Sequence, residues 1–91
     1  MARVGRKELA RSLDLLAHSV ALTLRLGDLV GGNHGRVGVL RSKLQRAQAD
    51  LDAHRRRQPF DKRLVRRRAD QVLSLVVEYL TALTAESDES A

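Results

Sequence analysis

Two helical patterns of this chain meet at residues 54–68, which read HRRRQPFDKRLVRRR. This stretch holds the only proline, Pro59, and eight of the 17 lysines and arginines. Proline has no N–H and a fixed φ, so it suits a helix end or a first turn. Asp61 follows two residues later as a candidate N-cap or first-turn acid. One helix is therefore expected to end before or at Pro59, and another to begin there.

The residues before this stretch predict a helix from about 36 to 57. Its apolar side is a single seam with 3-4-3-4-3 spacing. The seam consists of Val37, Leu40, Leu44, Ala47, Leu51 and His54. It covers only about 80° at 100° per residue. We therefore expect this helix on the outside of a bundle.

The two other predicted helices, at about 6–30 and 60–85, each carry more than one apolar row. The rows of the first are Leu9, Leu13, Leu16, Val20 and Leu24, and then Leu15, Leu22, Leu26 and Leu29. The last helix has Val65, Ala69, Val72, Val76, Tyr79 and Leu83, widened by Leu73, Val77 and Leu80 on one side and by Leu64 and Leu75 on the other. Each arc covers about 220°. Such helices are expected to be covered on two sides.

The chain is thus predicted to be all-α, a three-helix antiparallel bundle with helices at about 6–30, 36–57 and 60–85. The glycine-rich segment 31–35 connects the first two helices, because glycine adopts the left-handed conformation of a helix end without steric cost. It lacks the Gly-Lys-Ser/Thr of a phosphate-binding P-loop. We expect one domain, residues 1–85, followed by an acidic flexible tail, residues 86–91.

The second apolar rows of the first and third helices have no partner within one such chain. Soluble monomers rarely expose an apolar patch much larger than about 600 Å². A homodimer built on the first and third helices is therefore expected. The predicted interface residues are Leu15, Leu22, Leu29, Leu73 and Leu80.

The charge is strongly positive, with a formal net charge of +6. Antiparallel neighbours bring the start of the first helix, the end of the second and the start of the third to one end of the bundle, which we call the basic pole. Twelve of the 17 cations fall there: Arg3, Arg6, Lys7, Arg11, Arg55, Arg56, Arg57, Lys62, Arg63, Arg66, Arg67 and Arg68. A polyanionic partner would relieve the repulsion between them.

These observations predict a small nucleic-acid-binding protein that contacts phosphates non-specifically. The candidate contact residues are Arg55, Arg56, Arg57, Lys62, Arg63, Arg66 and Arg67. Proteins that bind single strands stack bases on aromatic side chains, and only Phe60 is near the pole. Duplex DNA or structured RNA is therefore the expected ligand. The alternative is a helical protein-interaction or assembly module, such as a phage or plasmid adaptor or inhibitor, that docks on an acidic protein surface.

Other functional classes have weaker support. Residues 8–20 weakly resemble a helix-turn-helix, but its second helix would expose Leu16 and Leu22, which favours one continuous helix. The three histidines are spread along the chain, so no metal site, cofactor or enzymatic activity is expected. No cysteine is present, and no apolar run approaches the ~20 residues of a membrane span. We expect a cytoplasmic protein that does not bind membranes.

Overall fold

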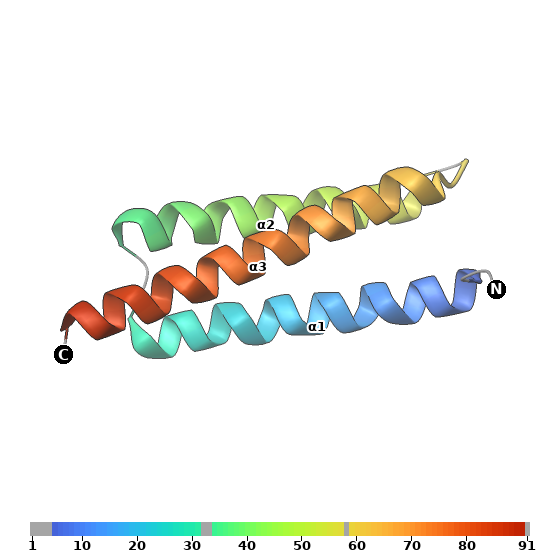
Figure 1. Cartoon of the computed structure of the whole chain (residues 1–91). Coiled ribbons are helices and arrows are strands. Elements are labelled where there is room, and N and C mark those ends of the chain that lie inside the picture. The colour runs from blue at the N-terminus through green and yellow to red at the C-terminus, as the bar shows by residue number, and fades with distance from the viewer. Residues whose placement is uncertain (1–4, 32–33, 58, 91) are drawn as a thin grey trace.

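The structure, a computed structural model, describes residues 5–31, 34–57 and 59–90, with the backbone alone for residue 6 and residues 86–90. It consists of three α-helices, α1 (Arg6–Val30), α2 (Gly35–Arg56) and α3 (Lys62–Ser90). Figure 1 shows that the chain reverses direction at each connection, so α1 and α3 run parallel to each other and antiparallel to α2. The prediction of an all-α, three-helix antiparallel bundle is confirmed.

The helix boundaries agree with the sequence-based ones at all but one end. Gly31 ends α1 in the left-handed conformation, with φ 73°, and its N–H donates to the carbonyl of Asp28. The carboxylate of Asp61 accepts a hydrogen bond of 3.1 Å from the N–H of Leu64, so Asp61 caps α3 as expected. The difference is the end of α3. The helix continues to Ser90, and no glycine or proline follows Pro59 to stop it earlier.

The helix α1 is unbroken from Arg6 to Val30. The turn that a helix-turn-helix requires within residues 8–20 is therefore absent, and that interpretation is wrong. A single helix is favoured because it keeps Leu9, Leu13 and Val20 on one buried side.

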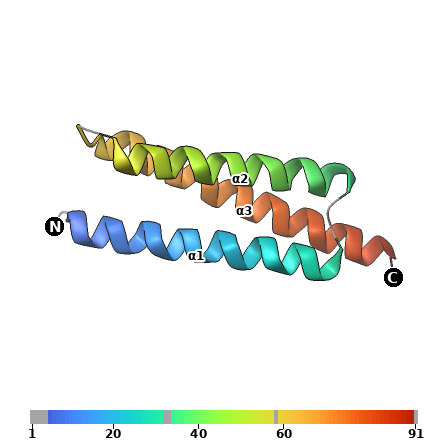
Figure 2. The same cartoon turned by 180° about the vertical axis from the view of Figure 1, so that it is seen from behind.

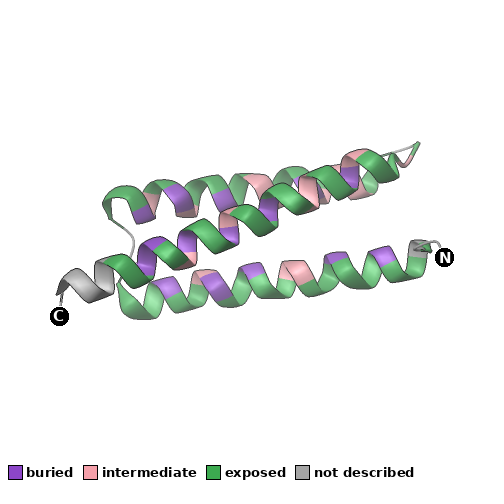
Figure 3. Ribbon diagram, in the orientation of Figure 1, coloured by how far each residue is buried: buried purple, intermediate pink, exposed green. Residues whose placement is uncertain are grey.

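The best-packed part of the core lies between α2 and α3, which contact each other more extensively than any other pair of helices. The side chains that water does not reach at all are Val37, Leu44 and Leu51 of α2, and Val65, Val72 and Tyr79 of α3. Figure 3 shows these buried positions as a regular series along the facing sides of the helices. The single seam predicted for α2 is therefore the seam that packs.

The helix α1 is attached to this hairpin by fewer contacts. Seen from behind in Figure 2, it runs beside α3 and below α2. Two ion pairs join it to α2: Arg41 with Asp28, at 2.9 Å, and Arg55 with Asp14, at 3.0 Å. The Arg41 guanidinium also donates to the carbonyl of Leu24, at 3.1 Å. Polar links thus supplement a limited apolar contact.

The predicted dimer-interface residues lie mostly on the surface of the single chain. Leu15, Leu22, Leu29 and Leu73 are exposed, and so are Leu26 and Val77, which belong to the same rows. The fifth predicted residue, Leu80, is half-buried and packs against the buried core residues. Leu80 therefore contributes to the fold of the monomer, because it lies closer to the core side of α3 than its row suggests.

The helix α1 approaches α3 closely at Gly27, where a β-carbon would overlap the hydroxyl of Tyr79. That hydroxyl is buried and has no hydrogen-bond partner among the described residues. Replacing a mid-helix glycine with alanine ordinarily stabilises a helix by about 1 kcal/mol. Here we expect Gly27→Ala to lower the free energy of unfolding by about 1–3 kcal/mol, because the added methyl group overpacks this contact.

The double variant Gly27→Ala, Tyr79→Phe provides the control. Removing the hydroxyl relieves the closest overlap and also removes an unsatisfied buried group, so Tyr79→Phe alone should be neutral or stabilising. Urea denaturation of the four proteins measures the coupling between the two positions. Equal effects of Gly27→Ala in the presence of Tyr79 and of Phe at position 79 would contradict this account.

Candidate nucleic-acid interface

The fold brings the predicted basic segments to one end of the molecule. Figure 1 places the first turn of α1, the last turn of α2 and the first turn of α3 together at the end where the N-terminus lies. Arg3 and the side chain of Arg6 lie outside the described residues. The other ten cations of the basic pole belong to described parts of the three helices and the connection after α2. They divide into paired and unpaired groups.

Arg55 and Arg68 form ion pairs. Arg55 crosses to Asp14 of α1, and its side chain is only 25% exposed. Arg68 lies 3.3 Å from Asp50 of α2, which also accepts a contact from His54. The Nε atom of Arg68 makes no hydrogen bond, so its alignment with Asp50 is poor and the attraction is mainly Coulombic. Both arginines therefore connect helices.

The surroundings of Arg55 differ from those expected, whereas its predicted phosphate contact stays a prediction. The sequence placed it among the phosphate contacts, as a side chain that projects outward from the end of α2. In the structure it is half-buried and bridges α2 to α1. Sequence reasoning missed this pair because Asp14 and Arg55 are 41 residues apart.

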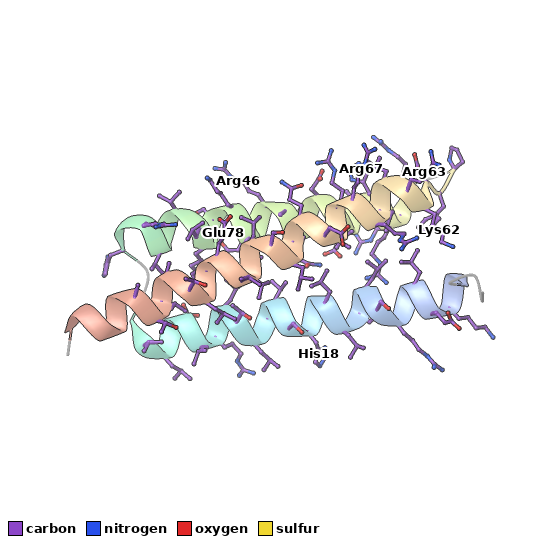
Figure 4. All side chains as sticks on the ribbon, in the orientation of Figure 1. His18, Arg46, Lys62, Arg63, Arg67 and Glu78 are labelled. Atoms are coloured by element: carbon purple, nitrogen blue, oxygen red, sulfur yellow. The ribbon has the colours of Figure 1, made fainter. Side chains whose placement is uncertain are left out.

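The remaining predicted contact residues are exposed. Arg56 and Arg57 lie at the end of α2, and Lys62, Arg63, Arg66 and Arg67 occupy the first two turns of α3. None of these five arginines forms an ion pair with a described acidic residue. In Figure 4, Arg63 and Arg67 project from the side of α3 that faces away from α1. The pole thus presents five arginines whose hydrogen-bonding groups remain available.

The helix backbones add to the positive potential of this end. The N-termini of α1 and α3 both lie at the pole, and each carries a partial positive charge of about one half. Gly5 precedes α1 with no side-chain cap, so N–H groups of its first turn have no side-chain acceptor there. The C-terminus of α2 contributes the opposite partial charge, and His54, Arg55 and Arg56 in its last turn compensate it. Anions are favoured at such an end.

The described surface shows no comparable site elsewhere. A groove between α2 and α3 is lined by both signs of charge, with Lys43, Arg46 and Arg68 beside Asp50 and Glu78. His18 is exposed on α1 and His34 is exposed just before α2, and no group of three or more metal-ligating side chains occurs among the described residues. None of the described helical segments is long and apolar enough to cross a membrane.

Searches against protein-family models, curated protein sequences and solved structures find no match to this chain. Function therefore has to be inferred from the geometry and charge of the pole itself.

The division into paired and unpaired arginines predicts opposite effects of the same substitution. Arg55→Gln loses the bridge to Asp14 and part of the packing between α1 and α2, and is expected to lower the free energy of unfolding by about 0.2–1 kcal/mol. Arg67→Gln removes a cation that repels Arg63, one helical turn away, and is expected to raise the free energy of unfolding by a few tenths of a kcal/mol. Urea denaturation at low salt measures both. A larger loss at Arg67 than at Arg55 would contradict this division.

Proposed function

We propose that the protein binds nucleic acid through its basic pole, by contacts to phosphates that do not depend on sequence. The observation that carries the proposal is the set of five exposed arginines that pair with no described acidic residue, Arg56, Arg57, Arg63, Arg66 and Arg67. They come from two helices that meet at one end. Arginine forms bidentate hydrogen bonds with phosphate, and phosphate contacts supply affinity without sequence information.

The shape of the pole favours a duplex or a structured RNA over a flexible single strand. Single-strand binding relies on exposed aromatic rings. Phe60, the one aromatic residue near the pole, is half-buried and packs against the core, so its ring is not a free stacking surface. Arg63 and Arg67 are one helical turn apart, about 6 Å along α3, which lets them reach neighbouring phosphates of a rigid backbone.

The proposal includes a homodimer and a cytoplasmic location. A homodimer would cover the exposed leucines of α1 and α3 and would bring a second basic pole to the same assembly. Two poles raise the effective affinity for a long polyanion beyond that of one. A cytoplasmic location fits a chain without cysteine, because disulfides are rare in that reducing compartment.

A second candidate function is protein interaction without nucleic acid. The observation that favours it is the row of exposed apolar side chains on α1, including Leu22 at 61% and Leu29 at 86% exposure. Such patches mark interaction sites. In this case the basic pole would dock on an acidic protein surface. Stoichiometric capture of one acidic partner, together with no binding to nucleic acid, would establish the alternative.

The proposal predicts a steep dependence of binding on salt. With about four to six phosphate contacts per chain, the slope of log K against log salt on duplex DNA should be about −0.9 per contact. Affinity should then fall by two or more orders of magnitude between 50 and 200 mM salt, roughly equally for unrelated sequences. Fluorescence-anisotropy titration with random-sequence duplexes measures both quantities.

Two double variants that each remove two positive charges test whether binding occurs at the basic pole. Arg56→Ala with Arg67→Ala should weaken binding and reduce the slope by nearly two. Arg36→Ala with Arg46→Ala removes two exposed arginines of α2 outside the pole and should change both quantities much less. Arg41 is unsuitable as a control because it holds α1 to α2. Absence of micromolar binding to duplex DNA and structured RNA at low salt would overturn the proposal in favour of protein interaction.

A further inference from the structure

The uncovered apolar side chains form one surface across two parallel helices, which we call the open face. It consists of Leu15, Leu22, Leu26 and Leu29 of α1 and Leu73 and Val77 of α3. Between the helices runs a groove whose lining includes Leu15 and Ser19 on one side and Arg66 and Leu73 on the other. Both helices therefore contribute to a single site that another helix could occupy.

The spacing along the open face is that of a coiled-coil seam. On α1 the positions 15, 19, 22, 26 and 29 are separated by four, three, four and three residues. On α3 the positions 66, 70, 73 and 77 repeat the same pattern. The buried rows of both helices have this spacing too, for example Val65, Val72, Val76 and Tyr79. A surface with this repeat fits helices crossing at about 20°.

The open face leaves a large apolar area in water. Its six side chains are between 49% and 86% exposed, and contiguous exposed apolar patches of this kind mark interaction sites. Pairing two copies would remove apolar surface of both chains from water, as specific interfaces do. A second copy of the chain supplies an identical row at the same spacing, so it is the occupant that this surface fits.

Charge then determines the relative direction of the two copies. Gly27 packs on Tyr79, so Leu22 lies at about the height of Ser74, in the middle of the open face. Lys62 and Glu86 lie 12 residues to either side of Ser74 on α3, about 18 Å each way. The Lys62 end of α3 belongs to the basic pole. The opposite end, whose sequence contains Glu86, Asp88 and Glu89, is called the acidic end.

A parallel pair would place basic pole beside basic pole and acidic end beside acidic end. An antiparallel pair, with its two-fold axis perpendicular to the helices, places the acidic end of each α3 at the height of the partner's basic pole. Unlike charges then lie at the same height at both ends, and like charges are separated by most of the 47 Å length of the chain. Both arrangements can cover the open face, although they pair different helices, so the charges at the two ends favour the antiparallel one.

We infer that two copies associate antiparallel through the open face, with a basic pole at each end of the dimer. This rests on the homodimer of the proposed function but not on nucleic-acid binding. Arg63 and Arg67 remain on the outer surface of such a dimer, because they project away from α1 (Figure 4), whereas Arg66 lies in the groove. The dimer would therefore bind two polyanion segments at opposite ends.

Distances between spin labels test the arrangement directly, without nucleic acid. The chain has no cysteine, so a single introduced cysteine gives one label per copy. Ala10 and Ala21 are exposed positions on α1. Along the helix, Ala10 lies near the basic pole and Ala21 lies beside Leu22, at half the length of the open face. For an antiparallel dimer we expect about 40 Å between labels at Ala10→Cys and about 20 Å or less at Ala21→Cys. Similar short distances at both positions would show a parallel dimer and overturn the inference.

Matched variants test the surface. Leu22→Glu and Leu73→Glu should abolish the dimer in sedimentation at tens of micromolar, while circular dichroism shows unchanged helix content, because both side chains are exposed in the single chain. Val39→Glu alters an equally exposed apolar residue of α2, 56% against 53% for Leu73, and should leave the dimer intact. A wild-type chain that sediments as a monomer would overturn the inference while leaving the salt titration of the basic pole unaffected.

Discussion

Six side chains of α2 and α3 are fully excluded from water and alternate along the whole contact between the two helices. They are Val37, Leu44, Leu51, Val65, Val72 and Tyr79. Burying each apolar side chain contributes about 1.5–3 kcal/mol relative to leaving it in water, so this contact is the main stabilising interaction of a small chain. It also places the end of α2 beside the start of α3 (Figure 1). The arginines at the end of α2 and the start of α3 meet because this hairpin packs.

The helix α1 depends on the hairpin and is held less tightly. It contributes one buried row, a close contact of Gly27 with Tyr79, and two ion pairs to α2. Because three helices offer α1 only one packed side, its second row of leucines remains in water. The surface thus has two features, a charged end and an apolar middle. They overlap at Arg66, which lines the groove beside Leu15 and Leu73. Arg63 and Arg67 project away from α1 (Figure 4), so association of two copies is compatible with binding of a polyanion by these two arginines.

The charge distribution opposes stability at the basic pole. Cations near the N-termini of α1 and α3 face the positive ends of the helix dipoles, and five exposed arginines have no acidic partner among the described residues. Proteins have only about 5–15 kcal/mol of net stability, and small ones lie at the low end. Bound phosphates would offset this repulsion, which is the physical reason to regard the pole as a binding surface.

Hydrophobic periodicity and helix-end residues are local properties, and the sequence by itself determined what depends on them. Spacing and composition are enough to predict the three helices and the seam of α2. They also predict the capping by Asp61 and the position of the basic segments at one end. Which of two apolar rows faces the core depends on how each helix is rotated against the others, so only the tertiary structure decided that Leu80 packs inside while Leu73 stays exposed. The role of Arg55 was decided in the same way. Its partner Asp14 is remote in the chain, and a contact between residues that far apart exists only after the helices have packed.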